Sequence, residues 1–406
     1  MLFPLSLLAL LALATPAKLC SVLDYGARGD NVTEDTPFLQ AAIDACTPGT
    51  TIFPSPGKYL SRSLNLTGKS NIELVIEAGA ALVLWSDIDT YNASGVFNDF
   101  IYTAAWNRTS LITAPLLSNI SIHGGGTIDG QGWRWWPSSG SRARPRLISL
   151  VGVNGLRLDN LTLRDSPSWN TNLRGAFMSI TNMRVESNVG SCRGYYGAPN
   201  TDAFNIGGHD IYLADNQVHN GDDCIPVFAW NNEDTYNVLA ERVECNCGTN
   251  GGVVILGDDT CGGAHANIYN VTFRDMVVTG TNQGAGVKIC ESYMIPHGLI
   301  SNITWENYTI RNPRNTPLYT NVIVEDGCSV PRNLSRTNWL STEGLAFRGV
   351  RANVAPHTPA GCFVCTDERP CSGMVFEDVV VEGASPYVCQ NAHSASAAGS
   401  SPAPCG

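Results

Sequence analysis

The feature that most constrains the fold is a loose repeat of short apolar runs that turn at asparagine. Alternating apolar residues lie on both sides of an Asn in residues 156–163, 267–273 and 302–310. Such runs are typical of β-strands, and the Gly, Asn, Asp and Ser residues between them mark turns. The imperfect repeat predicts an all-β solenoid, in which each turn buries its inner side chains against the next turn. A large β-sandwich or barrel, which also has many short strands, is the alternative.

One segment departs from this pattern and predicts a helix. Residues 35–46 start with a capping Asp, carry Pro in the first turn, and then place apolar residues at helical spacing. The open N-terminal end of a solenoid needs a cap, and this short helix is the natural candidate. We expect a Cys20–Cys46 disulfide to hold it in place.

The chain reads as a single domain between two short terminal segments. Residues 1–17 form an apolar stretch that is too short for a membrane span and ends in small residues, as in a secretory signal peptide. No domain boundary interrupts residues 18–390. Residues 391–406 are rich in Ala, Ser, Pro and Gly, and we expect them to form a flexible tail pinned by Cys405.

The composition indicates the cellular compartment of the protein and the classes of partner that it can bind. The formal net charge of −11 argues against nucleic acid as a partner, because phosphate contacts need clustered Lys and Arg. The 14 cysteines all follow the predicted signal peptide, and disulfides persist in oxidising compartments. Asn-x-Ser/Thr acceptor sites recur along the chain, as in a secreted glycoprotein. We therefore expect a secreted, extracellular monomer with neither a nucleic-acid nor a membrane partner.

Three aspartates carry the clearest chemical signal. Asp202 precedes the adjacent pair Asp222-Asp223 by 20 to 21 residues, a plausible length for one solenoid turn. Stacked turns lie about 4.8 Å apart, so the three carboxylates can converge, and at least one should keep its proton to a higher pH. Glycosidic bond hydrolysis needs one protonated acid and one ionised base. Adjacent strand residues point to opposite faces, so the pair needs a bend, which Gly221 permits.

The motifs around these aspartates resemble those of the polygalacturonase-type glycoside hydrolases, glycoside hydrolase family 28. The signature lies in Asn200-Thr201-Asp202 and Gly221-Asp222-Asp223-Cys224. Further agreement comes from residues 24–30, 124–132 and 166–169. The resemblance implies a right-handed parallel β-helix that hydrolyses pectic polysaccharide with inversion and without a cofactor or metal.

The resemblance also implies roles for individual residues. Asp222 would protonate the glycosidic oxygen, while Asp202 and Asp223 would hold and deprotonate the attacking water. Inverting enzymes keep the acid and the base about 6.5–9.5 Å apart to leave room for that water. Lys288 would bind a substrate carboxylate as a point charge, and Asn200 is a further candidate for substrate binding.

Three residues that the family pattern leads us to expect are replaced by glycine. Gly251 aligns with the active-site histidine, Gly286 with an arginine, and Gly327 with a cleft tyrosine. Loss of a bidentate arginine argues against tight recognition of two adjacent galacturonates. His265 could reach the cleft and replace the lost imidazole as a substrate-binding residue, or it could be an exposed loop residue.

Cysteines near the aspartates fit a disulfide better than a metal. Cys245 and Cys247 lack a partner set with the spacing of a zinc site. We expect a Cys224–Cys247 disulfide to clamp the turn after the proposed acid.

These observations favour an inverting glycoside hydrolase that cleaves α-1,4-galacturonosyl linkages in pectin. A hydrolase of rhamnogalacturonan or xylogalacturonan with the same mechanism is an open alternative, as is a non-catalytic carbohydrate-binding protein. A pectate-lyase-like enzyme would need a calcium site and an arginine base, and the glycine at position 286 argues against it.

Overall fold

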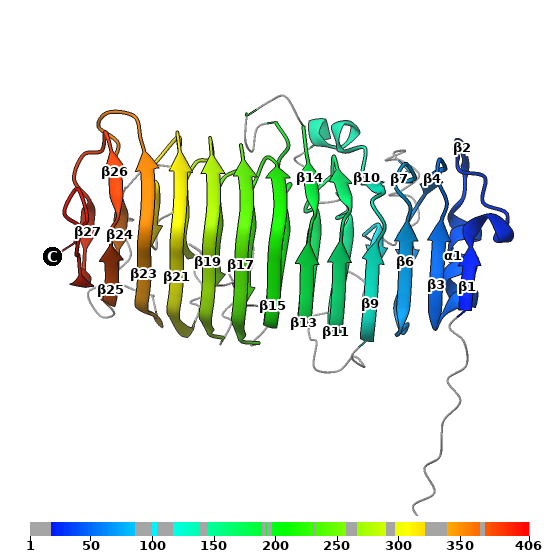
Figure 1. Ribbon diagram of the computed structural model, residues 1–406, viewed down its shortest axis with the longest axis horizontal. Coiled ribbons are helices and arrows are strands. Elements are labelled where there is room, and N and C mark those ends of the chain that lie inside the picture. The colour runs from blue at the N-terminus through cyan, green and yellow to red at the C-terminus, as the bar shows by residue number, and fades with distance from the viewer. Residues whose placement is uncertain are drawn as a thin grey trace, which may run out of the picture.

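The computed structural model is an elongated coil of β-strands whose turns stack side by side along one axis (Figure 1). It describes residues 18–85, 99–103, 117–138, 144–188, 192, 197–229, 233–256, 266–289, 297–320, 339–365 and 370–405. Strands from successive turns pair in parallel, which confirms the predicted parallel β-helix over the sandwich and the barrel.

Each turn contributes strands to three parallel ladders, and the longest strands bend to join more than one. The first ladder contains β1 (Lys18–Ser21), β3 (Gly49–Phe53), β6 (Ile72–Ile76), β9 (Leu117–His123), β11 (Ile148–Asp159), β13 (Thr171–Thr181), β15 (Phe204–His219), β17 (Thr235–Asn246), β19 (Ile268–Thr279), β21 (His297–Arg311), β23 (Trp339–Asn353), β25 (Cys371–Glu377) and β28 (Ala392–Ser396). The second adds β2 (Asp30–Glu34), β4 (Lys58–Ser61), β7 (Ala81–Leu84), β10 (Thr127–Asp129), β12 (Thr162–Arg164), β14 (Arg184–Glu186) and β26 (Val380–Glu382). The third, which carries the candidate site, adds β5 (Leu64–Asn65), β8 (Ile101–Tyr102), β16 (Ile225–Ala229), β18 (Gly252–Leu256), β20 (Ala285–Ile289), β22 (Leu318–Thr320), β24 (Cys362–Val364) and β27 (Val388–Gln390).

Asparagines occupy corners at which the chain turns from one ladder to the next. The backbone φ is 51° at Asn160, 55° at Asn270 and 53° at Asn302. Asn adopts this left-handed conformation more readily than other side-chain-bearing residues because its short amide bonds locally. The amide nitrogen of Asn302 donates to the amide oxygen of Asn270 in the preceding turn at 3.3 Å. The repeated Asn of the sequence therefore marks corners of the coil, and it links turns as well.

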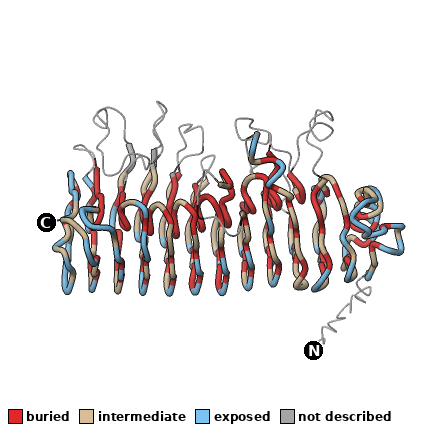
Figure 2. Tube along the Cα trace, turned by 90° about the horizontal axis from the view of Figure 1, so that it is seen from above, coloured by how far each residue is buried: buried red, intermediate tan, exposed pale blue. Residues whose placement is uncertain are grey.

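The core runs along the axis inside the coil. Figure 2 shows buried residues in every successive turn. Ring stacking joins four turns through Phe273, Trp305, Phe347 and Phe376, with centroid separations of 5.9, 4.7 and 5.3 Å. All four side chains are fully buried. Each such burial contributes roughly 1.5–3 kcal/mol, so the turns hold one another in register mainly through their inner side chains.

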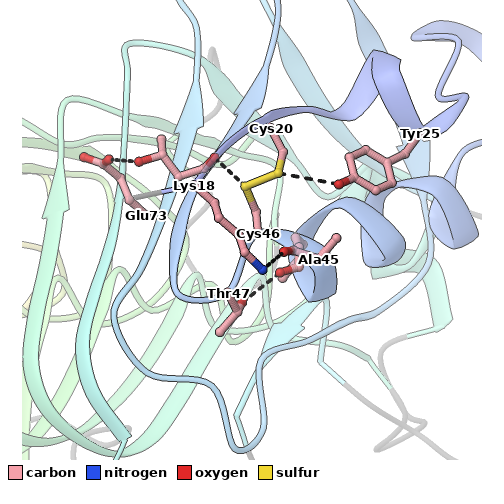
Figure 3. Close-up of a disulfide and its surroundings, with 9 residues drawn as sticks. Lys18, Cys20, Tyr25, Ala45, Cys46, Thr47 and Glu73 are labelled. Carbon is pink, nitrogen blue, oxygen red and sulfur yellow. Dashed lines mark hydrogen bonds between the residues drawn. A yellow bond between two sulfur atoms is a disulfide. The ribbon is translucent and has the colours of Figure 1, made fainter. Parts of the chain in front are cut away.

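The predicted helix covers the N-terminal end of the coil. Helix α1 (Thr36–Cys46) buries Leu39 and Ile43 in the core. The Cys20–Cys46 disulfide joins the end of this helix to β1, as the sequence led us to expect (Figure 3). Short 3-10 segments occur at Val22–Tyr25, Gly132–Arg134 and Trp136–Ser138. Among the described residues, no helix combines the length and apolar character that a membrane crossing requires.

The last residues continue the coil. We expected a flexible tail at 391–406, yet β28 pairs with β25 in this segment. Ala392 is buried, and Cys405 forms the disulfide with Cys389. The strand pairing, the buried Ala392 and the disulfide therefore hold this segment on the last turn, although its composition is typical of a flexible tail.

The predicted Cys224–Cys247 disulfide is wrong. Cys224 bonds to Cys245, and Cys247 bonds to Cys192. Strand β17 ends at Asn246, and Cys247 follows with a left-handed φ of 70°. Cys224 and Cys245 belong to the hydrophobic core, whereas Cys247, past this bend, lies outside that cluster and pairs with Cys192.

Candidate active site

Four successive turns bring Trp169, Asp202, Asp223 and Asn250 to one level at the start of the third ladder. Backbone hydrogen bonds of 2.8 to 2.9 Å between turns fix this level: Asn170 N to Asp202 O, Ala203 N to Asp223 O, and Cys224 N to Asn250 O. The predicted spacing of one turn between Asp202 and Asp223 is therefore correct. One carboxylate oxygen from each of Asp202, Asp222 and Asp223 lies within 4.8 Å of the others, so the three acids converge as expected.

A bend between β15 and β16 lets two adjacent aspartates face the same site. The Asn220 amide nitrogen donates to the carbonyl oxygens of Thr201 and Asp223, both at 3.0 Å. The backbone nitrogen of Gly221 donates to the Thr201 hydroxyl at 2.8 Å. Residues 221–224 lie outside the strands, so the alternation that would separate Asp222 from Asp223 does not apply there.

Asp222 has the electrostatics of a general acid. Its burial, followed by the charge of Asp223, raises its pKa to about 6, although Lys288 and the Thr249 hydroxyl partly offset the increase. A free aspartic acid has a pKa of about 3.9. Asp222 therefore keeps its proton at mildly acidic pH, where an exposed aspartate has lost it.

Asp223 is surrounded by donors. It accepts hydrogen bonds from the Thr249 hydroxyl and from the Asn250 amide nitrogen, the latter at 2.5 Å. The Lys288 ammonium lies 3.7 Å from its second carboxylate oxygen. An ionised carboxylate only accepts hydrogen bonds, so this environment matches the ionised form that a base requires.

Thr249 connects the two acids. Its hydroxyl lies within hydrogen-bond distance of Asp223 and of Asp222 Oδ1, the latter at 2.8 Å. A hydroxyl carries one proton, so it donates to one carboxylate at a time. Sequence reasoning missed Thr249 and Asn250; the signal that could have found them is their position one turn, 27 residues, beyond the aspartate pair.

Gly251 does not leave a vacant place in the site. A Cβ atom on Gly251 would lie 2.5 Å from the Tyr308 hydroxyl, 2.6 Å from Val278 Cγ2 and 2.7 Å from the Gly284 carbonyl oxygen. These neighbours leave no room for a side chain. In this turn the polar side chain beside the carboxylates belongs to Asn250, one residue earlier than the motif alignment suggested.

Gly286 is likewise filled from a neighbouring turn. Its register partner is Tyr319, and a Cβ on Gly286 would lie 2.3 Å from the Tyr319 carbonyl oxygen and 2.6 Å from its ring. The Tyr319 hydroxyl donates to Asn250 Oδ1 at 2.6 Å. No sequence motif marks Tyr319, and this contact connects it to the site.

The remaining predicted residues have mixed outcomes. Asn200 lies two residues before Asp202, and its amide oxygen accepts from the buried Arg144 guanidinium at 2.7 Å. The Lys288 side chain is 40% exposed and reaches both solvent and Asp223. His265 and Gly327 lie outside the described residues.

Buried arginines lie on the N-terminal side of the aspartates. Arg146 sits over the Trp169 ring at 4.0 Å, and Arg174 sits over the Phe228 ring at 5.2 Å. The two rings stack with a centroid separation of 6.2 Å. With Lys288 on the opposite side, positive charges flank the three acids along the axis, in contrast to the net charge of −11.

Comparisons with known proteins agree on one family. The model of glycosyl hydrolases family 28 matches residues 60–399. Polygalacturonase-2 of Solanum lycopersicum is 25% identical over 93% of this chain and 78% of its own length. Rhamnogalacturonase A of Aspergillus niger is also 25% identical, over 93% of this chain and 76% of its own length.

The solved structures confirm the fold. The endo-xylogalacturonan hydrolase of Aspergillus tubingensis superposes with a TM-score of 0.68, at 18% identity, over 94% of this chain and 100% of that one. The right-handed parallel β-helix implied by the sequence motifs is thereby confirmed.

Proposed function

The chain belongs to glycosyl hydrolases family 28 and is a glycoside hydrolase, and from this premise we propose that it cleaves α-1,4-galacturonosyl linkages in pectin with inversion. One observation carries the proposal: three carboxylate oxygens converge within 4.8 Å, and one of these acids, Asp222, has its pKa raised to about 6. Such a division between a protonated and an ionised acid is what glycosidic hydrolysis requires.

In this proposal one aspartate acts as the acid, and the other two act together on the attacking water. Asp222 transfers its proton to the glycosidic oxygen as the bond to the anomeric carbon breaks. Asp202 and Asp223 hold a water molecule and take its proton as its oxygen attacks the anomeric carbon from the opposite face. The product then carries the inverted configuration, and the proton gained by the base returns through solvent to the acid.

The separation of the acids makes product stereochemistry an important test. One oxygen of each acid lies within 4.8 Å of the others, which is closer than the about 6.5–9.5 Å between the carboxyl groups of typical inverting enzymes. The inverting assignment therefore rests on the family motifs. Proton NMR of the first product should show the β-anomer from an α-linked substrate, and a first-formed α-anomer would reject inversion.

An acidic polysaccharide matches the charges of the site. The Lys288 ammonium can pair with a substrate carboxylate, and buried guanidinium groups of Arg146 and Arg174 contribute positive potential on the other side of the acids. Because the protein as a whole is acidic, this local charge favours binding of a uronate polymer at the aspartates rather than elsewhere.

We place this activity outside the cell. Residues 1–17 have the pattern of a secretory signal peptide and lie outside the described residues. The disulfides Cys20–Cys46, Cys224–Cys245 and Cys389–Cys405 fit an oxidising compartment. Retention of the protein inside a eukaryotic host that expresses the full chain would contradict secretion.

A branched or rhamnose-containing backbone is the second candidate substrate. The observation that favours it is the contact between Gly286 and Tyr319, which leaves no room for the second carboxylate-binding cation that a run of galacturonates would engage. A rhamnogalacturonase and a xylogalacturonan hydrolase are among the proteins that this chain resembles.

Release of reducing ends by the purified protein tests these proposals together. Polygalacturonate, rhamnogalacturonan and xylogalacturonan are offered in parallel, with Asp222→Asn as the control. Release from polygalacturonate supports the first candidate, and release from either of the others alone supports the second. No release from any of them by a folded protein would favour a non-catalytic carbohydrate-binding role.

A further inference from the structure

We propose that Tyr319 acts through Asn250 as a positioning residue that holds the amide nitrogen of Asn250 against the base Asp223. The inference rests on the proposed function, because it assigns a role in the hydrolytic step. It also assigns a purpose to a tyrosine that stands in the space next to Gly286.

The contacts form a continuous chain across three turns. The Tyr319 hydroxyl donates to Asn250 Oδ1 at 2.6 Å, and Asn250 Nδ2 donates to Asp223 Oδ1 at 2.5 Å. Tyr319 and Asn250 are fully buried, and Asp223 is 2% exposed. Loss of either bond therefore leaves a buried polar group without that partner.

The order of donors and acceptors fixes the orientation of the amide. A carboxamide has an acceptor oxygen on one side and a donor nitrogen on the other, and a half-turn exchanges them. With a phenol hydroxyl on one side and a carboxylate on the other, only one orientation satisfies both neighbours. Without the hydroxyl of Tyr319, the Asn250 oxygen loses its donor, and the amide is held against Asp223 from one side only.

The phenol is suited to remain a donor. Burial, followed by the charge of Asp223, raises the pKa of Tyr319 well above its usual value. The hydroxyl therefore keeps its proton throughout the pH range in which a glycosidase works.

Space for the tyrosine comes from the missing side chain of Gly286. These two residues are paired in register on β20 and β22, and a Cβ on Gly286 would lie 2.6 Å from the ring. Gly286, at the position where an arginine was expected, therefore makes room for the tyrosine that supports Asn250.

The test compares Tyr319→Phe with Tyr308→Phe. Tyr308 is an equally buried tyrosine on the core side of the same turns. Among the residues that the structure describes, its hydroxyl bonds to backbone groups alone, Gly252 N and Gly284 O. Each variant loses one buried hydroxyl, so general effects on stability are matched. Thermal unfolding, kcat, KM and the pH dependence of kcat/KM are measured on the most active of the three pectic polymers.

For Tyr319→Phe we expect a decrease in kcat of about tenfold with KM changed by less than about twofold. Lys288, Asp202 and Asp222 face the same carboxylate and remain intact in this variant. Tyr308→Phe should keep the wild-type kcat and pH profile even where its unfolding temperature falls.

A double-mutant comparison tests whether the effect passes through Asn250. In an Asn250→Ala background, adding Tyr319→Phe should leave kcat unchanged, because the amide that the tyrosine orients is gone. An independent further loss would overturn the proposal. If Asn250→Ala does not fold, the comparison of the two Tyr→Phe variants still decides.

The outcomes separate this inference from the proposed function. An active wild-type protein whose Tyr319→Phe variant keeps its kcat, or whose Tyr308→Phe variant loses as much, would overturn the inference alone. Failure of the wild-type protein to release reducing ends from any of the three polymers would overturn the proposed function, and the inference with it.

Discussion

Replacing Asp222 by asparagine should abolish hydrolysis and at the same time stabilise the fold at neutral pH. The pKa of Asp222 is raised from 3.8 to about 6, mainly by burial and then by the charge of Asp223. A carboxyl group with a raised pKa in the folded protein binds its proton more tightly there than in the unfolded chain. Its contribution to stability is therefore fully present below about pH 4 and is lost as pH rises through about 6.

The size of the effect follows from the shift. An increase from 3.8 to about 6 is about two units, and at about 1.4 kcal/mol per unit the ionisation of Asp222 costs about 3 kcal/mol of stability at pH 7. Asparagine has nearly the same shape and stays neutral. The free energy of unfolding of Asp222→Asn should exceed that of the wild type by up to about 3 kcal/mol at pH 7 and should match it at pH 4.

Urea denaturation at the two pH values measures this difference, and reducing-end release measures activity. The matched control is Asp215→Asn, since the Arg242 guanidinium lowers the pKa of Asp215 and its removal should give no gain at pH 7. An Asp222→Asn variant that is less stable at pH 7 than at pH 4, relative to wild type, would refute the electrostatic reasoning. Near wild-type hydrolysis by this variant would refute the assignment of the acid.

Three further predictions concern the surroundings of this acid. Thr249→Val should move the alkaline limb of the pH–rate profile to higher pH by about one unit, because the Thr249 hydroxyl lowers the pKa of Asp222. Thr249→Ser should restore the wild-type limb, and a valine variant with an unshifted limb would exclude this role. Lys288→Ala should weaken calorimetric binding of acidic oligosaccharides more than of neutral ones, and equal losses would remove its role as a carboxylate partner. Gly286→Ala should lower the free energy of unfolding, measured with urea, by about 1–3 kcal/mol, because the new Cβ would lie 2.3 Å from the Tyr319 carbonyl oxygen. An unchanged free energy of unfolding would show that β22 can move away.

Local sequence patterns were sufficient to predict the repeating architecture of the fold. Alternating apolar residues that turn at asparagine predicted a solenoid, because few side chains other than Asn tolerate the left-handed corners seen at Asn160 and Asn270. The capping helix and its Cys20–Cys46 disulfide also followed from local pattern and proximity in the chain. Spacing by one turn correctly brought Asp202 to Asp223, since the rise between turns is set by backbone pairing and not by side chains.

Contacts between distant turns could not be predicted in this way. Asn250 and Tyr319 are 69 residues apart, and the turns between them differ in length, so no fixed period relates them. The prediction of a Cys224–Cys247 disulfide failed for a similar reason, because Cys247 has a left-handed backbone and pairs with Cys192, 55 residues earlier in the chain.

The sequence by itself determined that this chain coils into a β-solenoid and that Asp202 lies one turn from the pair Asp222-Asp223, because both properties depend on short-range periodicity. Only the tertiary structure decided what surrounds those aspartates. Whether Gly251 and Gly286 leave open space or are filled depends on side chains from other turns, here Tyr308 and Tyr319. Packing between turns sets the burial that raises the pKa of one acid and the donors that surround another, and burial is a property of the folded whole.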